Sequence, residues 1–391
     1  MTADLARAYN IADLREIAQR RLPKGLFEFI DRGNDDEIAV QENRSALDSI
    51  KLRPRVLVDV SKRTQEITLF GKKQAMPIIV GPTGSAGLAW YRGEIELARA
   101  AAKAGIPFTL ATASLTAFET IVEQAGGTLW CQLYMWPDRT LSHQLVERAR
   151  DAGYEALVFT VDTPVNPGRE YNLRNGLSFP FRFTRRNVVD VLRHPRWLAG
   201  VLGRYVTTTG MPQFENFPDS MRSSITSGRP GRAFAANDTV NADDIRALRK
   251  LWPGTLIIKG IQHPRDAIVA ADLGVDGVVV SNHGGRVLDS SRAPISSLPQ
   301  ILDAVGKRMT VIVDSGFRRG SDVAKALALG AHAVMIGRPT LYGTASGGEA
   351  GAARAIQIFR DELDRVLALL GCRSVAELDR SHLVIPEDRS R

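Results

Sequence analysis

One pattern recurs eight times along the 391-residue chain: a short apolar, β-rich run, a turn of small polar residues, and an amphipathic stretch. Strands and helices that alternate in this way are typical of a closed parallel (β/α)8 barrel. We expect strands over residues 77–80, 107–110, 129–133, 156–160, 255–258, 277–280, 310–313 and 333–336. The sequence therefore predicts an α/β fold, a TIM barrel that forms one domain over residues 1–391.

The stretches between the predicted strands carry helical periodicity. Apolar residues at i, i+3 and i+4 spacing occur over residues 94–104, 266–273 and 321–329. Each of these patterns ends at a glycine, Gly105, Gly274 or Gly330, where a left-handed C-cap is expected. The turn after the first predicted strand, residues 81–87, does not match the G-x-G-x-x-G fingerprint of a doubly wound sheet, which favours the closed barrel.

Residues 161–254, between the fourth and fifth predicted strands, are far longer than a βα connection needs, and such connections are usually functional. We call residues 177–217 the insert. Between residues 181 and 205, apolar residues are interleaved with six arginines, and the only acidic residue is Asp190. The arginines are Arg182, Arg185, Arg186, Arg193, Arg196 and Arg204. This composition is typical of a peripheral membrane contact with Trp197 as an anchor, and a basic lid packed on its own barrel is the alternative.

The net charge of +8 and the pI of about 9.6 would suit a protein that binds nucleic acid, anionic lipid or a small anion. A basic soluble enzyme is the simpler interpretation. Cys131 and Cys372 lack metal-binding or redox spacing, so we expect a buried thiol and no metal. The first 20 residues lack a signal-peptide core, and no apolar run reaches 18 residues. We expect a cytoplasmic protein without a spanning helix.

Polar residues follow the predicted strands, at the rim where barrel active sites lie. Residues 281–286 read Ser-Asn-His-Gly-Gly-Arg after the sixth strand. His283 can accept a proton near neutral pH, and Arg286 can bind a carboxylate with two hydrogen bonds. Asp162 and Arg169 follow the fourth strand. Asp162 could orient His283, and Arg169 could bind the carboxylate as a second arginine, although a structural salt bridge between the two would also account for them.

Two further rim segments indicate a phosphate site. Residues 314–320 read Asp-Ser-Gly-Phe-Arg-Arg-Gly after the seventh strand, and Gly337 and Arg338 follow the eighth. Loops at these two positions often bind phosphate, and Arg318 and Arg338 would neutralise a dianion there. An exposed basic turn is the alternative. Lys259 ends the fifth strand, where an unpaired buried ammonium would be costly, so we expect it to face a negative charge.

Together with Gln132-Leu133-Tyr134, residues 160–164 and Lys259-Gly260, these motifs resemble the FMN-dependent 2-hydroxy acid dehydrogenase and oxidase family over residues 22–383. The resemblance implies an FMN cofactor and oxidation of a 2-hydroxy acid. His283, paired with Asp162, is then expected to take the substrate proton, and Tyr134 to contact the substrate oxygen. Arg169 and Arg286 are expected to bind the substrate carboxylate.

The resemblance also implies the FMN contacts. Lys259 is expected near the flavin edge on which negative charge develops during reduction, because a fixed cation stabilises that charge. The other implied contacts are Pro82, Thr83, Gly84, Thr112, Gln132, Thr160, Ser281, Asp314, Ser315, Gly316, Arg318, Gly337 and Arg338.

Four positions depart from the common family pattern or discriminate within it. Phe29 stands where members usually have a tyrosine that binds the carboxylate, and Ala111 stands where a serine often contacts the flavin. Ala113 replaces a bulky aromatic residue found in some relatives, which predicts a roomy pocket. Gly84 resembles the dehydrogenases, since oxidases tend to have alanine there.

Within the family, the insert resembles that of the mandelate dehydrogenases. This implies oxidation of a bulky or aromatic (S)-2-hydroxy acid such as mandelate, a quinone-type acceptor, a homotetramer, and contact with the inner face of the cell membrane. The alternatives are an oxidase that uses O2, another FMN barrel such as isopentenyl diphosphate isomerase, and a non-enzymatic basic barrel that binds membrane or nucleic acid. We expect no nucleic-acid partner.

Overall fold

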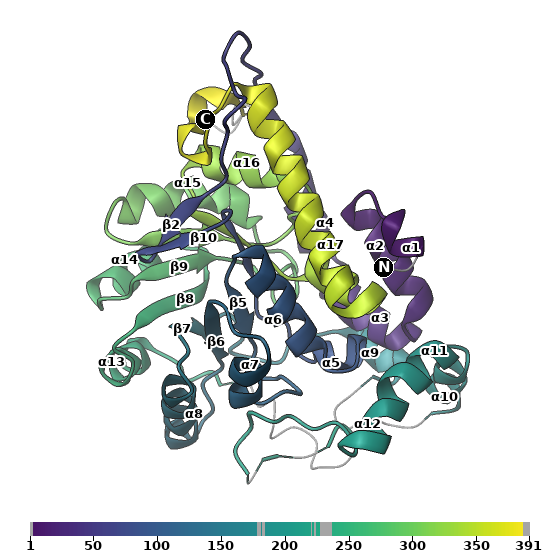
Figure 1. The fold of residues 1–391 in the computed structure, drawn as a ribbon. Helices are drawn as coiled ribbons and strands as arrows, with labels where there is room; N and C mark the ends of the chain where they lie inside the picture. The colour runs from purple at the N-terminus through teal and green to yellow at the C-terminus, as the bar shows by residue number, and fades with distance from the viewer. Residues whose placement is uncertain are drawn as a thin grey trace.

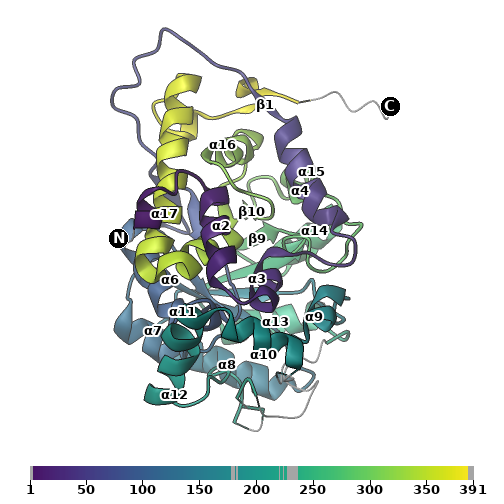
Figure 2. The same cartoon turned by 90° about the vertical axis from the view of Figure 1, so that its right-hand side faces the viewer.

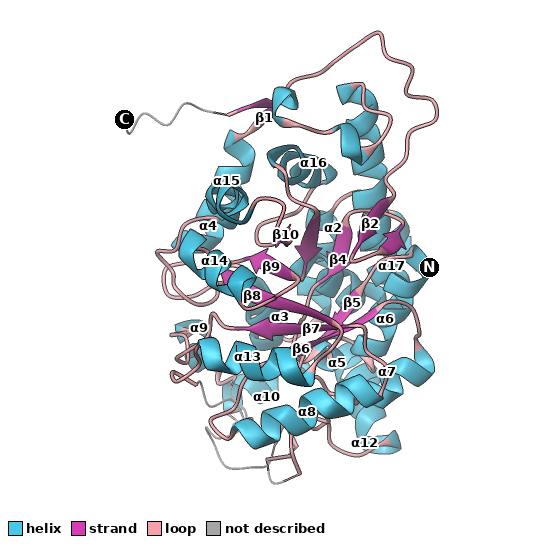
Figure 3. Cartoon of the chain, turned by 90° about the vertical axis from the view of Figure 1, so that its left-hand side faces the viewer, coloured by secondary structure: helices cyan, strands magenta, loops and turns pink. Residues whose placement is uncertain are grey.

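Eight parallel strands close into a barrel in the computed structural model, as the sequence predicts (Figures 1 and 3). The structure describes residues 3–177, 181, 184–219, 221–222, 224–226 and 237–385. Each strand pairs with the next along the chain, and the last pairs with the first. The strands are β4 (Ile78–Val80), β5 (Phe108–Leu110), β6 (Leu129–Leu133), β7 (Ala156–Thr160), β8 (Thr255–Ile261), β9 (Gly277–Val280), β10 (Thr310–Val313) and β11 (Ala333–Ile336).

The strands are buried on both faces, which explains why they appear in the sequence as continuous apolar runs. Side chains such as Ile79, Val158 and Ile312 fill the barrel interior. A hairpin of β2 (Ile67–Leu69) and β3 (Lys72–Gln74) closes the amino end of the barrel, where the Phe70 ring packs edge-on against Trp130 at 5.8 Å. The interior is therefore a packed core, and the open end is the carboxyl rim.

Helices surround the barrel, as Figure 3 shows in cyan around the magenta strands. They are α6 (Gly93–Ala104), α7 (Phe118–Gln124), α8 (Arg139–Asp151), α13 (Ala242–Leu251), α14 (Pro264–Asp272), α15 (Pro294–Val305), α16 (Gly320–Leu329) and α17 (Arg338–Leu370). Gly105, Gly274 and Gly330 lie just beyond the ends of their helices at φ of 69°, 73° and 112°, so the three predicted glycine terminations are confirmed. No helix in the described ranges is long and apolar enough to cross a membrane.

The segments before β4 and after α17 pack outside the barrel. They form α1 (Ala3–Ala6), α2 (Ile11–Arg21), α3 (Lys24–Asp31), α4 (Ile38–Ser49) and an antiparallel pair of β1 (Lys51–Leu52) with β12 (Leu383–Val384), preceded by short 3-10 turns at Val375–Glu377 and Arg380–His382. The long α17 bends at Gly347 and Gly348 and packs against α2 and α6 (Figure 1). The C-terminal end of α3 reaches the carboxyl rim, where Phe29 and Ile30 line a cavity.

The long connection after β7 forms α9 (Glu170–Asn175), α10 (Arg185–Leu192), α11 (Pro195–Trp197), a π-helix (Leu198–Gly203) and α12 (Arg204–Thr208), which Figure 2 shows together in its lower half. The expectation that Trp197 anchors the insert in a membrane is wrong. Its side chain is 7% exposed, and its indole N–H donates to the Leu88 carbonyl at 2.7 Å, on α5 (Ala86–Ala89). Arg182, also expected in the basic surface, lies outside the described residues.

Strand β8 continues past the predicted end at residue 258 through an irregularity between Lys259 and Ile261. Gly260 has φ of +110°, and a Cβ added to it would lie 2.5 Å from the Asp162 Cβ. Glycine is therefore required at this point both by backbone conformation and by close packing. The bulge turns the chain so that Lys259 and Asp162 both stand at the rim.

We predict that Gly260→Ala destabilises the protein by more than about 2 kcal/mol, because positive φ and the clash with Asp162 add together. Gly153→Ala is the matched control: its φ is +88°, but an added Cβ would meet nothing within 4 Å. This control should lose only about 1 kcal/mol. Thermal and urea unfolding of both FMN-loaded variants check the difference, and equal losses would contradict it.

Candidate active site

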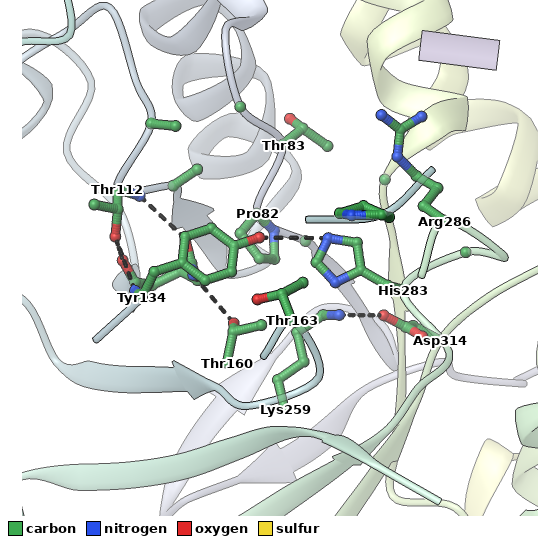
Figure 4. A pocket seen from close by; sticks show the side chains of 18 of the residues that line it. Pro82, Thr83, Thr112, Tyr134, Thr160, Thr163, Lys259, His283, Arg286 and Asp314 are labelled. Carbon is green, nitrogen blue, oxygen red and sulfur yellow. Dashed lines mark hydrogen bonds and ion pairs between the residues drawn. The ribbon is translucent and has the colours of Figure 1, made fainter. Parts of the chain in front are cut away.

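A cavity of about 500 Å³ opens at the carboxyl ends of the barrel strands (Figure 4). All predicted site residues except Asp162 and Ser281 line it: Phe29, Pro82, Thr83, Gly84, Thr112, Gln132, Tyr134, Thr160, Arg169, Lys259, His283, Arg286, Asp314, Ser315, Gly316, Arg318, Gly337 and Arg338. Asp162 and Ser281 lie directly behind lining residues, because both contact His283. The rim motifs thus converge on one space.

His283 lies between an acid and a phenol. Its Nδ1 is 2.8 Å from Asp162 Oδ1. Its Nε2 is 3.4 Å from the Tyr134 hydroxyl, as Figure 4 shows. Burial raises the pKa of Asp162, but the positive charges of His283 and Lys259 outweigh this effect and leave the pKa below its usual value. An ionised Asp162 requires a proton on Nδ1 of the imidazole. The Nε2 lone pair therefore points toward the cavity side.

The pKa of His283 lies below its usual value. Burial lowers this pKa, and the positive charges of Lys259 and Arg169 lower it further, whereas the Asp162 carboxylate raises it. Burial together with the charge of Asp162 raises the pKa of Tyr134 to about 12. At neutral pH the site therefore holds a neutral imidazole that can accept a proton and a phenol that can donate a hydrogen bond.

The turn after β9 fixes His283 by backbone geometry. His283, Gly284 and Gly285 have φ of 58°, 70° and 72°, three successive left-handed residues. The Ser281 hydroxyl accepts a hydrogen bond from the His283 N–H at 3.0 Å and another from the Lys259 ammonium at 2.9 Å. Glycine tolerates this conformation, whereas a non-glycine residue such as His283 is strained in it, as residues at functional sites often are.

Lys259 carries its charge in a buried position. Its Nζ lies 3.1 Å from Asp314 Oδ2, and the side chain is 6% exposed. Burial lowers the pKa of Lys259, but Asp314, Asp162 and Tyr134 raise it by more, so the pKa lies above its usual value. A lysine at this position is an ammonium at every physiological pH.

Four arginines of the cavity hydrogen-bond backbone carbonyls instead of acids. Arg286 donates to the carbonyls of Phe29 and Arg32 at 2.7 and 3.0 Å, and Arg338 donates to those of Ile30, Arg32 and Gly284 at 3.0, 3.0 and 2.7 Å. The other two are Arg169, which donates to the Arg286 carbonyl, and Arg318, which donates to that of Phe317. Within the described ranges none of the four forms an ion pair with a carboxylate.

The end of α3 explains how Arg286 and Arg338 are held. The carbonyls at a helix C-terminus lack partners within the helix and carry partial negative charge. Burial, reinforced by Arg169, lowers the pKa of Arg286 to about 10, and burial also lowers the pKa of Arg338. These directions mean that the cavity has more positive charge than its surroundings neutralise, which favours binding of anions.

The residues present fit FMN. Arg318 and Arg338, beside the left-handed Ser315 and Gly316, would hold the phosphate. Gln132, whose side-chain N–H donates to the Thr160 hydroxyl at 3.1 Å and whose side-chain carbonyl accepts from the Thr112 N–H at 3.1 Å, offers a fixed amide to a polar ring. A cavity of this size, with cations at one end and hydrogen-bonding groups on its floor, suits a phosphorylated aromatic cofactor.

Several cavity residues were not predicted. Apolar Trp136, Val165, Phe217 and Val240 line it, and Asn172 contributes a buried side-chain carbonyl oxygen without a partner in the described chain. Most of them lie in or beside the long connection, which carries no strand or helix periodicity that would place them. Three carbonyls at the end of α3 bind arginine, and two of the residues that carry them, Ile30 and Arg32, gave no sequence signal.

Comparison with known proteins agrees with this geometry. The family model for FMN-dependent dehydrogenases matches residues 18–385. The chain is 41% identical to the (S)-mandelate dehydrogenase of Pseudomonas putida over 96% of this chain and 93% of that protein, and 38% identical to a putative L-lactate dehydrogenase of Mycobacterium tuberculosis over 97% and 90%. The chain belongs to the FMN-dependent dehydrogenase family.

Solved structures place the same barrel in this family. A crystal structure described as that of the monotopic membrane protein (S)-mandelate dehydrogenase superposes with a TM-score of 0.90 at 40% identity, over 97% of this chain and all of that one. A mandelate oxidase matches with a TM-score of 0.79 at 34% identity, over 96% and 98%. The protein is thus an FMN-dependent oxidoreductase that acts on a CH–OH group, and the non-enzymatic and isomerase alternatives are set aside.

We infer that His283 is the catalytic base, which must be unprotonated, and its pKa is lowered. We therefore predict that kcat/KM rises with pH through a pKa below the usual histidine value and is level above it. In Asp162→Asn the carboxylate that opposes the lowering is gone, so the rising limb should move to lower pH. The plateau should fall by about 10³–10⁴-fold, since the wrong tautomer is favoured. Steady-state pH profiles of both proteins check this, and an unshifted limb would refute the coupling.

Proposed function

We propose that the protein oxidises an (S)-2-hydroxy acid with a bulky or aromatic side chain, such as mandelate, to the 2-oxo acid and passes the electrons to a quinone-type acceptor. The observation that carries the proposal is a neutral His283 whose unprotonated Nε2, 3.4 Å from the Tyr134 hydroxyl, faces the same cavity as Arg169 and Arg286, two arginines that form no ion pair within the described chain. A base opposite two anion-binding groups is what an acid with an adjacent hydroxyl requires.

The chain's own residues then act in sequence. Arg169 and Arg286 bind the substrate carboxylate and fix its orientation. Tyr134 donates a hydrogen bond to the substrate hydroxyl oxygen, and His283 Nε2 takes a proton from the substrate. Asp162 stabilises the imidazolium that results. When bound, FMN supplies the two-electron acceptor, and the Lys259 ammonium favours negative charge on it.

The apolar residues of the cavity lining support a bulky acid. Trp136, Phe217 and Val240 present apolar surface to it, and Ala113 leaves space. Phe29 lines the same cavity and stacks against the Arg286 guanidinium at 5.2 Å, so it contributes apolar surface but no hydroxyl for the carboxylate. Burial of an aromatic side chain offsets the missing hydrogen bond, whereas a methyl group would bury little. The identity to (S)-mandelate dehydrogenase agrees with this choice.

Membrane contact is part of the proposal, on the inner face of the cell membrane and with the protein as a homotetramer. The similar structure is described as a monotopic membrane protein. In this chain α10 exposes Val188, Val189 and Leu192 at 40%, 45% and 62%, beside Arg185 and Arg186. An exposed apolar helix with flanking arginines suits an interface with anionic lipid. Gly84 resembles the dehydrogenases of the family and not the oxidases, which supports a quinone-type electron acceptor. O2 is the alternative acceptor.

We predict that His283→Asn retains FMN and loses anaerobic reduction of the flavin by mandelate, by at least about 10³-fold. Asparagine fills similar space but cannot take a proton. Stopped-flow absorbance of the oxidised flavin band measures the reduction rate, and the flavin-to-protein ratio controls for folding. Rapid reduction in this variant would remove the central role of His283.

We also predict that Ala113→Leu lowers kcat/KM for (S)-mandelate by about 10²-fold and leaves that for (S)-lactate within about threefold, because the added methyl groups occupy space that only the larger side chain uses. Both acids are compared on the same preparation, so lactate is the internal control. Equal losses for the two acids would mean that Ala113 does not border the substrate side chain.

A further inference from the structure

A second cavity, of about 730 Å³, lies beneath α10. Residues of α3, α10 and the π-helix line it, and most of the lining side chains are apolar, among them Leu26, Val191, Leu198, Leu202 and Ile225. Nothing in the proposed oxidation of the acid uses this space. A large apolar cavity with little to hydrogen-bond suits a hydrocarbon chain rather than a polar metabolite.

The walls of this cavity are built into the fold. The π-helix Leu198–Gly203 brings Leu198 and Leu202 to the same wall, and such wider turns are common at functional sites. The adjacent Trp197 is fixed by its hydrogen bond to the Leu88 carbonyl, and both residues line the cavity. The buried tryptophan that does not anchor the protein in a membrane therefore serves as part of this lining.

The position of the cavity links the predicted membrane side to the catalytic cavity. Leu177 lines both cavities, so a single side chain contributes to both walls. On the outer side α10 contributes Val188 and Leu192, which are also exposed at the surface, and Arg185 and Arg193 lie beside them. An apolar chain that enters at α10 would extend toward the site where the electrons leave the substrate.

We propose that this cavity binds the isoprenoid tail of the quinone acceptor and directs its head group to the Leu177 wall, an inference that rests on the proposed function. In the overall reaction the 2-hydroxy acid loses two electrons and two protons to become the 2-oxo acid, and the quinone gains two electrons and two protons to become the quinol. The acyl chain of a membrane lipid has the same apolar chemistry, but it has no reason to end beside the catalytic cavity.

The test compares quinones with and without a tail. FMN-loaded protein is reduced anaerobically by light with EDTA, so the result does not depend on which acid is the substrate, and its reoxidation is followed by stopped flow. Decylubiquinone should reoxidise the wild type at least about tenfold more efficiently than 2,3-dimethoxy-5-methyl-1,4-benzoquinone, which lacks the tail. Leu202→Trp, which fills the cavity, should abolish this advantage and leave the rate with the tailless quinone unchanged.

Val206→Trp is the matched control, because Val206 is 53% exposed on α12 and does not line the cavity; it should keep the advantage. The unchanged rate with the tailless quinone shows that Leu202→Trp is folded, and Leu198→Trp repeats the test from another wall position. Equal rates for both quinones in the wild type, or an advantage that survives filling of the cavity, would overturn the proposal. If filling instead weakens binding to phosphatidylglycerol vesicles and spares the tail advantage, the occupant is a lipid acyl chain and the proposal is wrong.

Discussion

The hydrogen bonds between the last turn of α3 and two rim arginines organise the whole site. Arg286 follows β9 and Arg338 follows β11, yet both donate to the Arg32 carbonyl, at 3.0 Å each. These carbonyls orient the guanidinium groups without neutralising them, because a backbone carbonyl carries only partial charge. The cavity therefore keeps positive charge available for the FMN phosphate and, as we propose, for the substrate carboxylate.

The same principle separates the roles of the charged residues. Lys259 has a carboxylate partner in Asp314 and is a permanent ammonium, whereas His283 has one in Asp162 and is a neutral base. Asp162 sits behind His283 and does not line the cavity, whereas Asp314 lines it next to Lys259 and neutralises that ammonium. The rest of the polar face presented to the ligand is a lone pair, a phenol and guanidinium groups. That arrangement accepts an anion and removes a proton from it, which is the chemistry of hydroxy-acid oxidation.

The barrel and its rim could be predicted from sequence because both rest on local patterns. Each buried strand is a continuous apolar run, and each motif that follows one, such as residues 281–286 or Gly337 and Arg338, must reach the same rim once the barrel closes. The end of α3 could not be placed in this way, since a helix far away in sequence reaches the rim only through tertiary packing. Trp197 shows the same limit: the composition of the insert suggested that this residue anchors the protein in a membrane, but packing on α5 buries its side chain.

The measurement that tests the account most directly is an anaerobic absorbance titration of the wild-type, FMN-loaded protein with (S)-mandelate, (S)-lactate and glycolate. The account predicts that (S)-mandelate bleaches the oxidised flavin band with one equivalent per flavin and does so faster than the two smaller acids. A flavin that stays oxidised with every 2-hydroxy acid would contradict it, because the His283 base and the two carboxylate-binding arginines would then have no substrate of the proposed class.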